Sequence, residues 1–270
     1  MSKSRNNHIL QMIDKIGFGL EIGPSYNPVT SKKSGWNVEV ADHLDAIALR
    51  EKYSNWGVDV SAIEDVDYVV GSKGLLAAIG KESRFDFIIA SHVIEHVPDV
   101  VKFLVDCEKL LKSGGVLSLV VPDKRFCFDA LKPFTTTGQI LQAYFEKREK
   151  HSAGTIFDAH ALHAKKGEAI VWSDNARVSD LTFVHTIQEA KSIMENYMLG
   201  NEYMDVHAWQ FTPPSFEIII SDLIQLGYIG FEIAASFDTV GYEFFVSLRK
   251  SEKPNMKGFG NRANLAKHCV

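Results

Sequence analysis

The sequence predicts an α/β fold in which a doubly wound, mostly parallel sheet carries helices on both faces. Three apolar segments, 18–22, 85–90 and 116–121, each run directly into a turn of glycine, serine or proline residues. Segments with helical periodicity alternate with them, which is typical of βαβ units. Ligands of such sheets bind outside the carboxyl ends of the strands, so the three turns are expected to outline one site.

Five strands and the helices between them are predicted in the first 123 residues. Apolar runs bounded by glycine or charged residues indicate the strands, and amphipathic periodicity indicates the helices. Ser113, Gly114 and Gly115 are typical of a helix C-terminus. The strands are expected at 20–22, 36–41, 67–70, 85–90 and 116–121, and the helices at 8–16, 44–53 and 99–111.

The end of the sheet departs from this alternation. A helix at 215–226 precedes two strands, 231–236 and 243–248, with no helix between them. Adjacent strands without an intervening helix form an antiparallel pair. The sheet is therefore expected to have seven strands, one of them antiparallel.

A long stretch separates strand five from that helix. It carries two helical patterns, 137–150 and 186–199, and is interpreted as a mainly helical insertion that caps the active site. The expected organisation is a core of residues 1–123 and 210–250, an inserted substrate cap of residues 124–209, and a loose C-terminal tail of residues 251–270.

Composition indicates a globular protein that works in a reducing cytoplasm. Hydrophobic residues make up 46% and charged residues 23% of the 270 residues, with a net charge of −5, which argues against an extended nucleic-acid or anionic-membrane surface. No apolar run reaches the roughly 18 residues of a membrane span, and the polar first residues lack a signal-peptide core. Three cysteines are too few and too scattered for a disulfide framework or a zinc ribbon. The oligomeric state stays open.

Two residues at strand ends have the chemistry of a nucleoside site. Gly23 ends the first strand, where a glycine lets the backbone approach a ligand closely. Asp42 ends the second strand, where an acid can accept both ribose hydroxyls. Dinucleotide enzymes share these features, but their full G-x-G-x-x-G fingerprint is absent here.

The strand-four and strand-five segments carry a specific resemblance. They read FDFIIASHVIEHVPD (85–99) and LLKSGGVLSLVVPD (110–123), and they resemble class I S-adenosylmethionine-dependent methyltransferases. Of the glycine-rich first turn of many relatives only Gly23 is present. The resemblance implies S-adenosylmethionine as cofactor. The cofactor-binding residues that it implies are Glu21, Gly23, Pro24, Ser25, Asp42, His43, Gly71, Ser72, Ser91 and His92.

Segments of the insertion resemble a bacterial branch of these enzymes that is associated with cell-surface polysaccharide assembly. They read PDKRFCFD (122–129), IFDAH (156–160) and DVHAWQFTP (205–213). The implied activity is O-methylation of a sugar or glycan hydroxyl, in O-antigen, another surface polysaccharide or a precursor. Aromatic rings suit the C–H faces of a sugar and polar groups its hydroxyls. The expected substrate-binding residues are Lys124, Arg125, Trp172 and Trp209, although packing under a lid also explains the tryptophans.

A hydroxyl that attacks the sulfonium methyl must lose its proton, and histidine is the commonest base near neutral pH. His207 and Asp123 are the leading catalytic candidates because both are expected where acceptor and cofactor meet. His160 and His185 come next.

A metal site is the alternative reading of the same region. His92, Glu95, His96 and His207 resemble the metal quartet of the small-RNA 2′-O-methyltransferases, with His92 in place of their first glutamate. A divalent ion there would hold two vicinal hydroxyls and lower the pKa of one. The Glu-His pair is also common in metal-free methyltransferases, where its role is structural, so the sequence favours the histidine base. The inverted zinc-protease motif H-x-x-E-H does not fit the strand-turn context.

Two classes of function follow from the sequence. One is an O-methyltransferase, acting on a sugar or else on another small-molecule or RNA hydroxyl. The other is a non-catalytic module that binds S-adenosylmethionine. The first turn favours this second class because it keeps only Gly23 of the glycine-rich motif. The intact strand-end residues and the histidine-rich insertion favour the enzyme.

Overall fold

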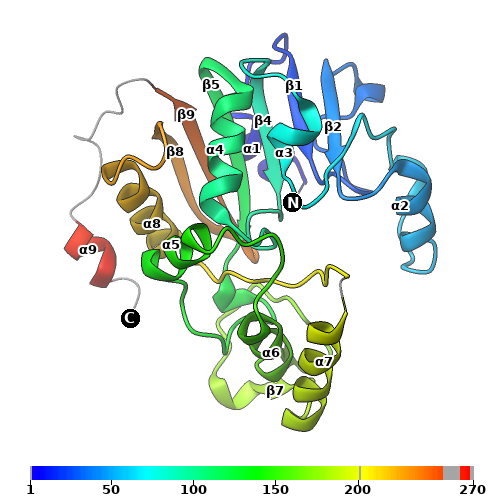
Figure 1. The fold of residues 1–270 in the computed structure, drawn as a ribbon, viewed down its shortest axis with the longest axis vertical. Helices are drawn as coiled ribbons and strands as arrows, with labels where there is room; N and C mark the ends of the chain where they lie inside the picture. Colours follow the sequence, from blue (N-terminus) through cyan, green and yellow to red (C-terminus); the bar gives the residue numbers. More distant parts are fainter. Residues whose placement is uncertain (1, 201, 252–261, 268–270) are drawn as a thin grey trace.

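A seven-stranded sheet forms the centre of the computed structural model, which describes residues 2–200, 202–251 and 262–267 (Figure 1). The strand order is β3-β2-β1-β4-β5-β9-β8. The first five strands are parallel to one another, and β9 runs antiparallel to both of its neighbours, β5 and β8. The predicted fold class is thereby confirmed. The strands are β1 (Gly19–Ile22), β2 (Val38–Asp42), β3 (Tyr68–Val69), β4 (Phe85–Ser91), β5 (Leu111–Pro122), β8 (Phe231–Val240) and β9 (Glu243–Lys250).

Helices cover both faces of the sheet. One face carries α3, α4 and α8, and the N-terminal helix α1 packs on β5 and β9 at the other face (Figure 1). No helix among the described residues is long and apolar enough to cross a membrane. The helices that flank the sheet are α1 (Ser2–Leu10), α2 (Ala46–Tyr53), α3 (Leu75–Ile79), α4 (Val100–Leu110) and α8 (Pro213–Gln225).

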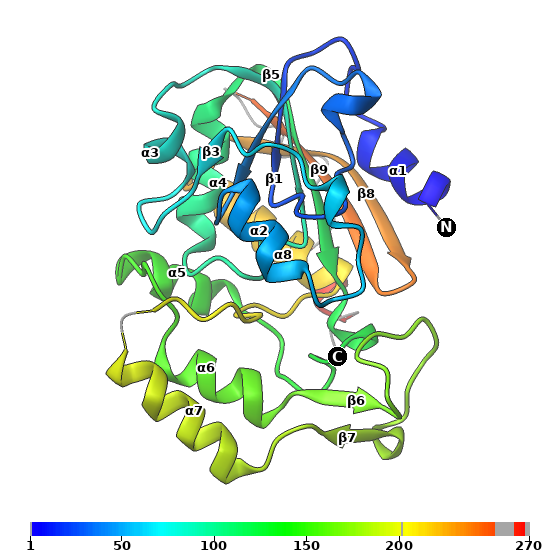
Figure 2. The ribbon, with the colours of Figure 1, turned by 90° about the vertical axis from the view of Figure 1, so that its right-hand side faces the viewer.

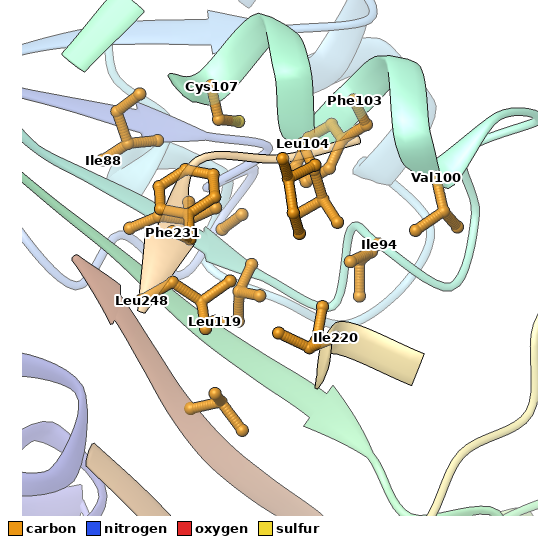
Figure 3. Close-up of a cluster of buried hydrophobic side chains, with 14 of the residues drawn as sticks. Ile88, Ile94, Val100, Phe103, Leu104, Cys107, Leu119, Ile220, Phe231 and Leu248 are labelled. Carbon is orange, nitrogen blue, oxygen red and sulfur yellow. The ribbon is translucent and has the colours of Figure 1, made fainter. Parts of the chain in front are cut away.

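The main hydrophobic core lies between α4, α8 and the sheet. Leu104 and Cys107 of α4 face Ile88 of β4, and Ile220 of α8 closes the cluster from the other side (Figure 3). These four side chains are at most 1% exposed. Burying one such aliphatic side chain contributes about 1.5–3 kcal/mol. The Asp99 carboxylate accepts a hydrogen bond from the Lys102 amide and so starts α4 at the carboxyl end of β4.

Residues 124–209 lie outside the seven-stranded sheet, beyond the carboxyl ends of the parallel strands. The arrowhead of β5 points toward this unit (Figure 2). Its helices α6 and α7 pack together, and β6 and β7 form an antiparallel pair. Its elements are α5 (Thr137–Phe145), α6 (Ala153–Ala161), β6 (Ala164–Lys166), β7 (Leu181–Phe183) and α7 (Ile187–Leu199).

Helix α5 differs from the rest of this unit because it belongs to the main core. Its Ile140 and Ala143 are completely buried in the cluster described above. It contacts α4 and α8. The helix ends at Phe145, five residues before the predicted end at residue 150.

Several element predictions were wrong in detail. The first helix spans Ser2–Leu10 and not 8–16, because Ile9 is buried against the sheet and Ser118 Oγ donates to the Ile9 carbonyl. The segment 113–115 belongs to β5 and not to a helix end, since β5 already pairs with β4 at Leu111. The sequence pattern missed α3, α6, β6 and β7, all nine residues or shorter.

Part of the predicted tail is described by the structure. Residues 262–267 form helix α9 (Arg262–Lys267), which contacts α8, and Arg262 pairs with Asp222 at 2.9 Å. Residues 252–261 and 268–270 of the predicted tail, including Cys269, lie outside the described residues.

Candidate active site

The residues predicted to bind the cofactor follow the carboxyl ends of four neighbouring parallel strands. Because the order is β3-β2-β1-β4, their turns share one edge of the sheet. This topology explains how residues far apart in sequence reach one edge. The set consists of Gly23, Pro24 and Ser25 after β1, Asp42 and His43 at the end of β2, Gly71 and Ser72 after β3, and Ser91 and His92 at the end of β4.

The turn after β1 has an unusual backbone. Gly23 and Ser25 both have positive φ angles, 63° and 49°, a region that favours glycine. A Cβ atom on Gly23 would lie 3.1 Å from Val93 Cγ2, so the glycine also allows close packing against the β4 turn. The buried Ser25 Oγ has no hydrogen-bond partner among the described residues. This turn therefore offers a close backbone approach and a free hydroxyl.

The side chain of Glu21, unlike that of Asp42, is hydrogen-bonded to a loop of the protein through both of its oxygens. Its carboxylate accepts hydrogen bonds from the amides of Val29 and Thr30, at 2.6 and 2.8 Å, and from the Thr30 hydroxyl. Burial raises the pKa of Glu21, and these hydrogen bonds oppose that effect. Glu21 thus holds the loop that follows the glycine turn, with both oxygens already used.

Asp42 retains one free acceptor. It is 3% exposed, and its Oδ1 accepts from the His43 amide and lies 2.6 Å from His43 Nδ1. Its Oδ2 has no partner in the part of the chain that the structure describes. A buried polar atom without a partner is costly, so Oδ2 fits a ligand hydroxyl such as that of a ribose.

The end of β4 is tied to the N-terminal helix and to β9. Arg5 donates to Ser91 Oγ and to Glu243 Oε1, both at 2.7 Å. His92 has a φ of 54°, and its Nε2 lies 2.7 Å from Glu243 Oε2. Burial by itself would lower the pKa of His92, but Glu243 and Glu95 raise it to about 9.

Three histidines surround the buried carboxylate of Glu95 in the turn that follows β4. Glu95 is 0% exposed, and neither of its oxygens has a hydrogen-bond partner among the described residues. Its Oε1 lies 3.4 Å from His92 Nδ1, 3.8 Å from His96 Nε2 and 3.9 Å from His207 Nε2. The structure therefore brings together all four residues of the predicted metal alternative.

Backbone contacts bring His207 to this cluster from the end of the insertion. The Ala208 amide donates to the Glu95 carbonyl at 2.8 Å, and Trp209 Nε1 donates to the Val97 carbonyl at 2.7 Å. His207 Nδ1 lies 2.6 Å from Asp129 Oδ2. Asp129 also pairs with the buried Lys132 at 2.6 Å. Burial alone would raise the pKa of Asp129, whereas His207 and Lys132 lower it to about 2.

Asp123, the other leading catalytic candidate, has its side chain fully engaged. It is completely buried at the end of β5. Its carboxylate accepts hydrogen bonds from the Arg125 amide and guanidinium and from the Thr239 hydroxyl. Asp123 thus joins the end of β5 to the end of β8. Among the described residues, its carboxylate forms no ion pair or hydrogen bond with the Glu95 cluster.

His160 and His185 lie apart from the cluster, within the insertion. Their rings are 5.3 Å from each other, and His185 is 6.1 Å from His163. His163 stacks on Phe128, whose ring in turn contacts His207. Two further rings therefore separate His207 from the pair, and His160 Nδ1 is already bonded to the Ile156 carbonyl at 2.8 Å.

A cavity of about 470 Å³ lies between α5, α6 and the 207–210 segment. His207, which belongs to the Glu95 cluster, and Trp209 both line it. Most of its lining is polar. The polar side chains that line it are Lys132, Thr135, Thr136, Gln139, Gln142, Arg148, Ser152, Thr155, Asp158, His207 and Gln210.

Only Trp209 of the four predicted substrate residues lines this cavity. Lys124 is buried and donates to the Ala130 carbonyl, and burial lowers its pKa. Arg125 pairs with Asp123 at 2.6 Å. Trp172 is 7% exposed and donates to the Arg125 carbonyl. These three side chains stabilise the start of the insertion.

Sequence reasoning missed most of the cavity and the carboxylates around the cluster. Asp129 and Asp205 stand in motifs quoted above, two residues from Cys127 and two from His207, but spacing does not pair them with a histidine. Asp205 Oδ1 lies 2.8 Å from His96 Nδ1, and this contact lowers the pKa of Asp205. Asp158 stands in the quoted segment 156–160, but neither that segment nor Arg148 indicates in the sequence that these side chains line a cavity.

Comparisons with known proteins agree with this architecture. A family model described as a methyltransferase domain matches residues 19–166. Sixty residues are 32% identical to a ubiquinone biosynthesis O-methyltransferase of Pasteurella multocida, and 52 residues are 40% identical to that of Cereibacter sphaeroides. The matched segments cover 22% and 19% of this chain and only 25% and 20% of these relatives.

Solved structures also resemble the chain over most of its length. The 1,6-didemethyltoxoflavin-N1-methyltransferase of Burkholderia thailandensis is 12% identical over 93% of this chain and 78% of its own, with a TM-score of 0.45. An S-adenosylmethionine-dependent methyltransferase from Mesorhizobium loti is 12% identical over 89% of this chain and 95% of its own, with a TM-score of 0.43.

The family model covers more than half of the chain, from the first residue of β1 to the end of β6. The sheet order and the single antiparallel strand are those expected for the class I S-adenosylmethionine-dependent methyltransferase fold. This protein therefore belongs to the methyltransferase domain family.

Proposed function

We propose that this protein transfers the methyl group of S-adenosylmethionine to a hydroxyl of a sugar or glycan. The observation that carries this proposal is the polar cavity that His207 lines. His207 also lies 3.9 Å from Glu95, in the turn after β4, the strand that ends in the predicted cofactor residue Ser91. Asp42 Oδ2 would accept the ribose hydroxyls, and the Gly23 turn would approach the cofactor through its backbone.

When bound, S-adenosylmethionine supplies an electrophilic methyl group on a sulfonium. The acceptor oxygen must approach that methyl in line and lose its proton, and alignment supplies much of the rate. His207 lines the cavity and belongs to the Glu95 cluster, so it links the two. This cluster is therefore the group that we expect to promote proton loss from the acceptor.

The cavity lining favours a carbohydrate acceptor. Amide, hydroxyl and carboxylate side chains match the hydroxyls of a sugar, and Trp209 supplies an apolar surface. The carboxylate of Asp158 has no hydrogen-bond partner among the described residues, and burial raises its pKa. We propose that it binds a sugar hydroxyl of a surface polysaccharide or of its precursor, on the same resemblance that the insertion segments carry.

An aromatic hydroxyl is the second candidate acceptor. The two matched relatives are named as O-methyltransferases of ubiquinone biosynthesis. Their similarity covers only a quarter or less of their length, and the cavity lining here is mostly polar. We therefore place the sugar acceptor first.

The test combines an acceptor screen with one cavity variant. Purified full-length protein is incubated with S-adenosylmethionine and sugar nucleotides, sugar phosphates, oligosaccharides or catechols, and S-adenosylhomocysteine is measured. We expect turnover with a sugar acceptor. Mass spectrometry and NMR should identify the product as an O-methyl sugar. Asp158→Asn should raise the acceptor KM roughly tenfold through a weakened charged hydrogen bond and leave cofactor affinity unchanged. Asp174→Asn, which removes an exposed carboxylate elsewhere in the insertion, is the control.

Each contrary outcome has a defined meaning. Turnover of catechols alone would replace the sugar with a phenolic acceptor. Binding of S-adenosylmethionine in calorimetry without turnover of any acceptor would favour the non-catalytic module. Equal KM values for wild type and Asp158→Asn would show that the acceptor does not bind in this cavity.

A further inference from the structure

The Glu95 cluster has a second level of organisation in the carboxylates behind its histidines. Each of the three rings directs one nitrogen toward Glu95 and the other toward a different outer carboxylate. The outer pairs are His92 Nε2–Glu243 at 2.7 Å, His96 Nδ1–Asp205 at 2.8 Å and His207 Nδ1–Asp129 at 2.6 Å. An outer carboxylate on one ring nitrogen orients the other nitrogen and makes it a better ligand, which is the usual surrounding of a metal-bound histidine.

Glu95 supplies an independent observation. It is completely buried, and its two oxygens lack hydrogen-bond partners among the described residues. Leaving a buried carboxylate without hydrogen bonds is strongly unfavourable unless the charge is paired or coordinates a metal. His92 Nδ1, at 3.4 Å, is the nearest nitrogen and interacts with Glu95 electrostatically. The nitrogens of His96 and His207, at 3.8 and 3.9 Å, lie too far away to donate normal hydrogen bonds to Glu95.

The spacing of these atoms suits a shared ion. One oxygen of Glu95, His96 Nε2 and His207 Nε2 all lie within 4.8 Å of one another. Ligand atoms around a tetrahedral ion with bonds of about 2.1 Å are separated by about 3.4 Å, so a small contraction would close the set. His92 Nδ1, at 3.4 Å from Glu95 Oε1, is already at that separation.

We propose that Glu95, His96 and His207 bind one divalent transition-metal ion, with His92 as an adjacent ligand. Imidazole nitrogens with one carboxylate favour zinc or cobalt over magnesium, which prefers oxygen ligands and water. The role of the ion rests on the proposed function: an open coordination position would face the cavity and bind the acceptor hydroxyl, which promotes its deprotonation. Binding of the ion itself does not depend on the identity of the acceptor.

Direct binding measurements test this proposal without cofactor or acceptor. Untagged full-length protein is treated with chelator, dialysed, and titrated with Co²⁺, Zn²⁺, Mn²⁺ and Mg²⁺. Calorimetry and elemental analysis give affinity and stoichiometry, and the visible absorption of bound Co²⁺ reports nitrogen and oxygen coordination. We expect one transition-metal ion per chain and much weaker binding of Mg²⁺.

Three variants locate the ion. Asp129→Asn leaves every proposed ligand in place and should weaken binding roughly tenfold to a hundredfold, the usual effect of an outer carboxylate. Glu95→Gln removes a ligand and should weaken it at least as much. Asp174→Asn is the matched control because Asp174 is an exposed carboxylate of the same insertion that pairs with Lys166, and this variant should bind like wild type. Circular dichroism verifies folding, and Asp129→Asn decides the result if Glu95→Gln does not fold.

The outcomes separate this proposal from the proposed function. Absence of stoichiometric binding in the wild type, or equal binding in the wild type, Asp129→Asn and Glu95→Gln, would overturn the metal site. Methyl transfer by the chelated protein at an unchanged rate would do the same and would leave His207 as a base. One bound ion in a protein that turns over no acceptor would retain the metal site and reject the proposed activity.

Discussion

At the scale of single residues, the most informative side chains are buried acids in which one oxygen has a hydrogen-bond partner and the other has none. Asp42 and Glu21 are both buried acids near the end of a parallel strand. Glu21 gives both oxygens to the loop that follows β1, whereas Asp42 keeps Oδ2 free. A buried oxygen without a partner has the most to gain from a ligand, so Asp42 is the better candidate for direct cofactor contact.

This difference predicts the effect of Asp42→Asn on cofactor affinity. The amide replaces a charged acceptor, so the affinity for S-adenosylmethionine should weaken by about 1–3 kcal/mol, measured by calorimetry. Asp45→Asn is the matched control, since Asp45 caps α2 three residues away and asparagine is also a good cap. Wild-type affinity in Asp42→Asn would place the ribose elsewhere.

At the scale of elements, α5 links the insertion to the core. Its inward face contributes Ile140 and Ala143 to the main cluster, although its sequence position is inside the predicted cap. Removing residues 137–199 would therefore expose part of the core and destabilise the sheet domain. A deletion that tests the cap must leave α5 in place.

The contribution of α5 can be measured with one substitution. Ile140→Ala creates a cavity in the core and should lower the free energy of unfolding by about 2–5 kcal/mol in urea denaturation. Phe145→Ala removes a larger side chain from the same helix, but Phe145 is 67% exposed, so its effect should stay below about 1 kcal/mol. Similar losses in both variants would contradict the assignment of α5 to the core.

At the scale of the whole molecule, the insertion carries histidines that fold in the neutral form. Burial, with Lys132 nearby, lowers the pKa of His163 to about 4, and burial also lowers that of His151 to about 4. An unfolded histidine titrates near pH 6.5. Between these values the two histidines bind more protons in the unfolded chain than in the folded protein. Their contribution to stability is therefore complete above about pH 6.5 and is lost as the pH drops toward 4.

Urea denaturation at pH 7, 6 and 5 would measure this dependence. The free energy of unfolding should decrease as the pH is lowered from 7 to 5. His163→Gln should show a smaller decrease because glutamine does not titrate. The quantity to compare is the slope of the unfolding free energy against pH in the wild type and the variant. The other titrating groups contribute equally to both slopes, and a uniform loss of stability in the variant does not change its slope. Parallel slopes would show that His163 is not held neutral by the fold.

Local patterns and motifs predicted the sheet and its edge. Apolar strands, their turn residues and the helix between β4 and β5 are encoded by neighbours in sequence, so the alternation of strands and helices could be predicted from them. The positions of Gly23 and Asp42 at strand ends could be predicted for the same reason. Short elements such as α3 and β6 were missed because a few residues show no period.

The arrangement of the site depended on contacts between distant segments. Four residues of the metal alternative could be named from the sequence, but their outer carboxylates come from Asp129, Asp205 and Glu243, which no spacing rule connects to them. The engagement of Asp123 by Arg125 and Thr239 likewise appears only in the folded chain. Sequence determines which chemical groups each strand end carries, whereas the tertiary structure decides which of those groups are already satisfied and which face one another, because hydrogen bonds and burial join residues that the chain keeps apart.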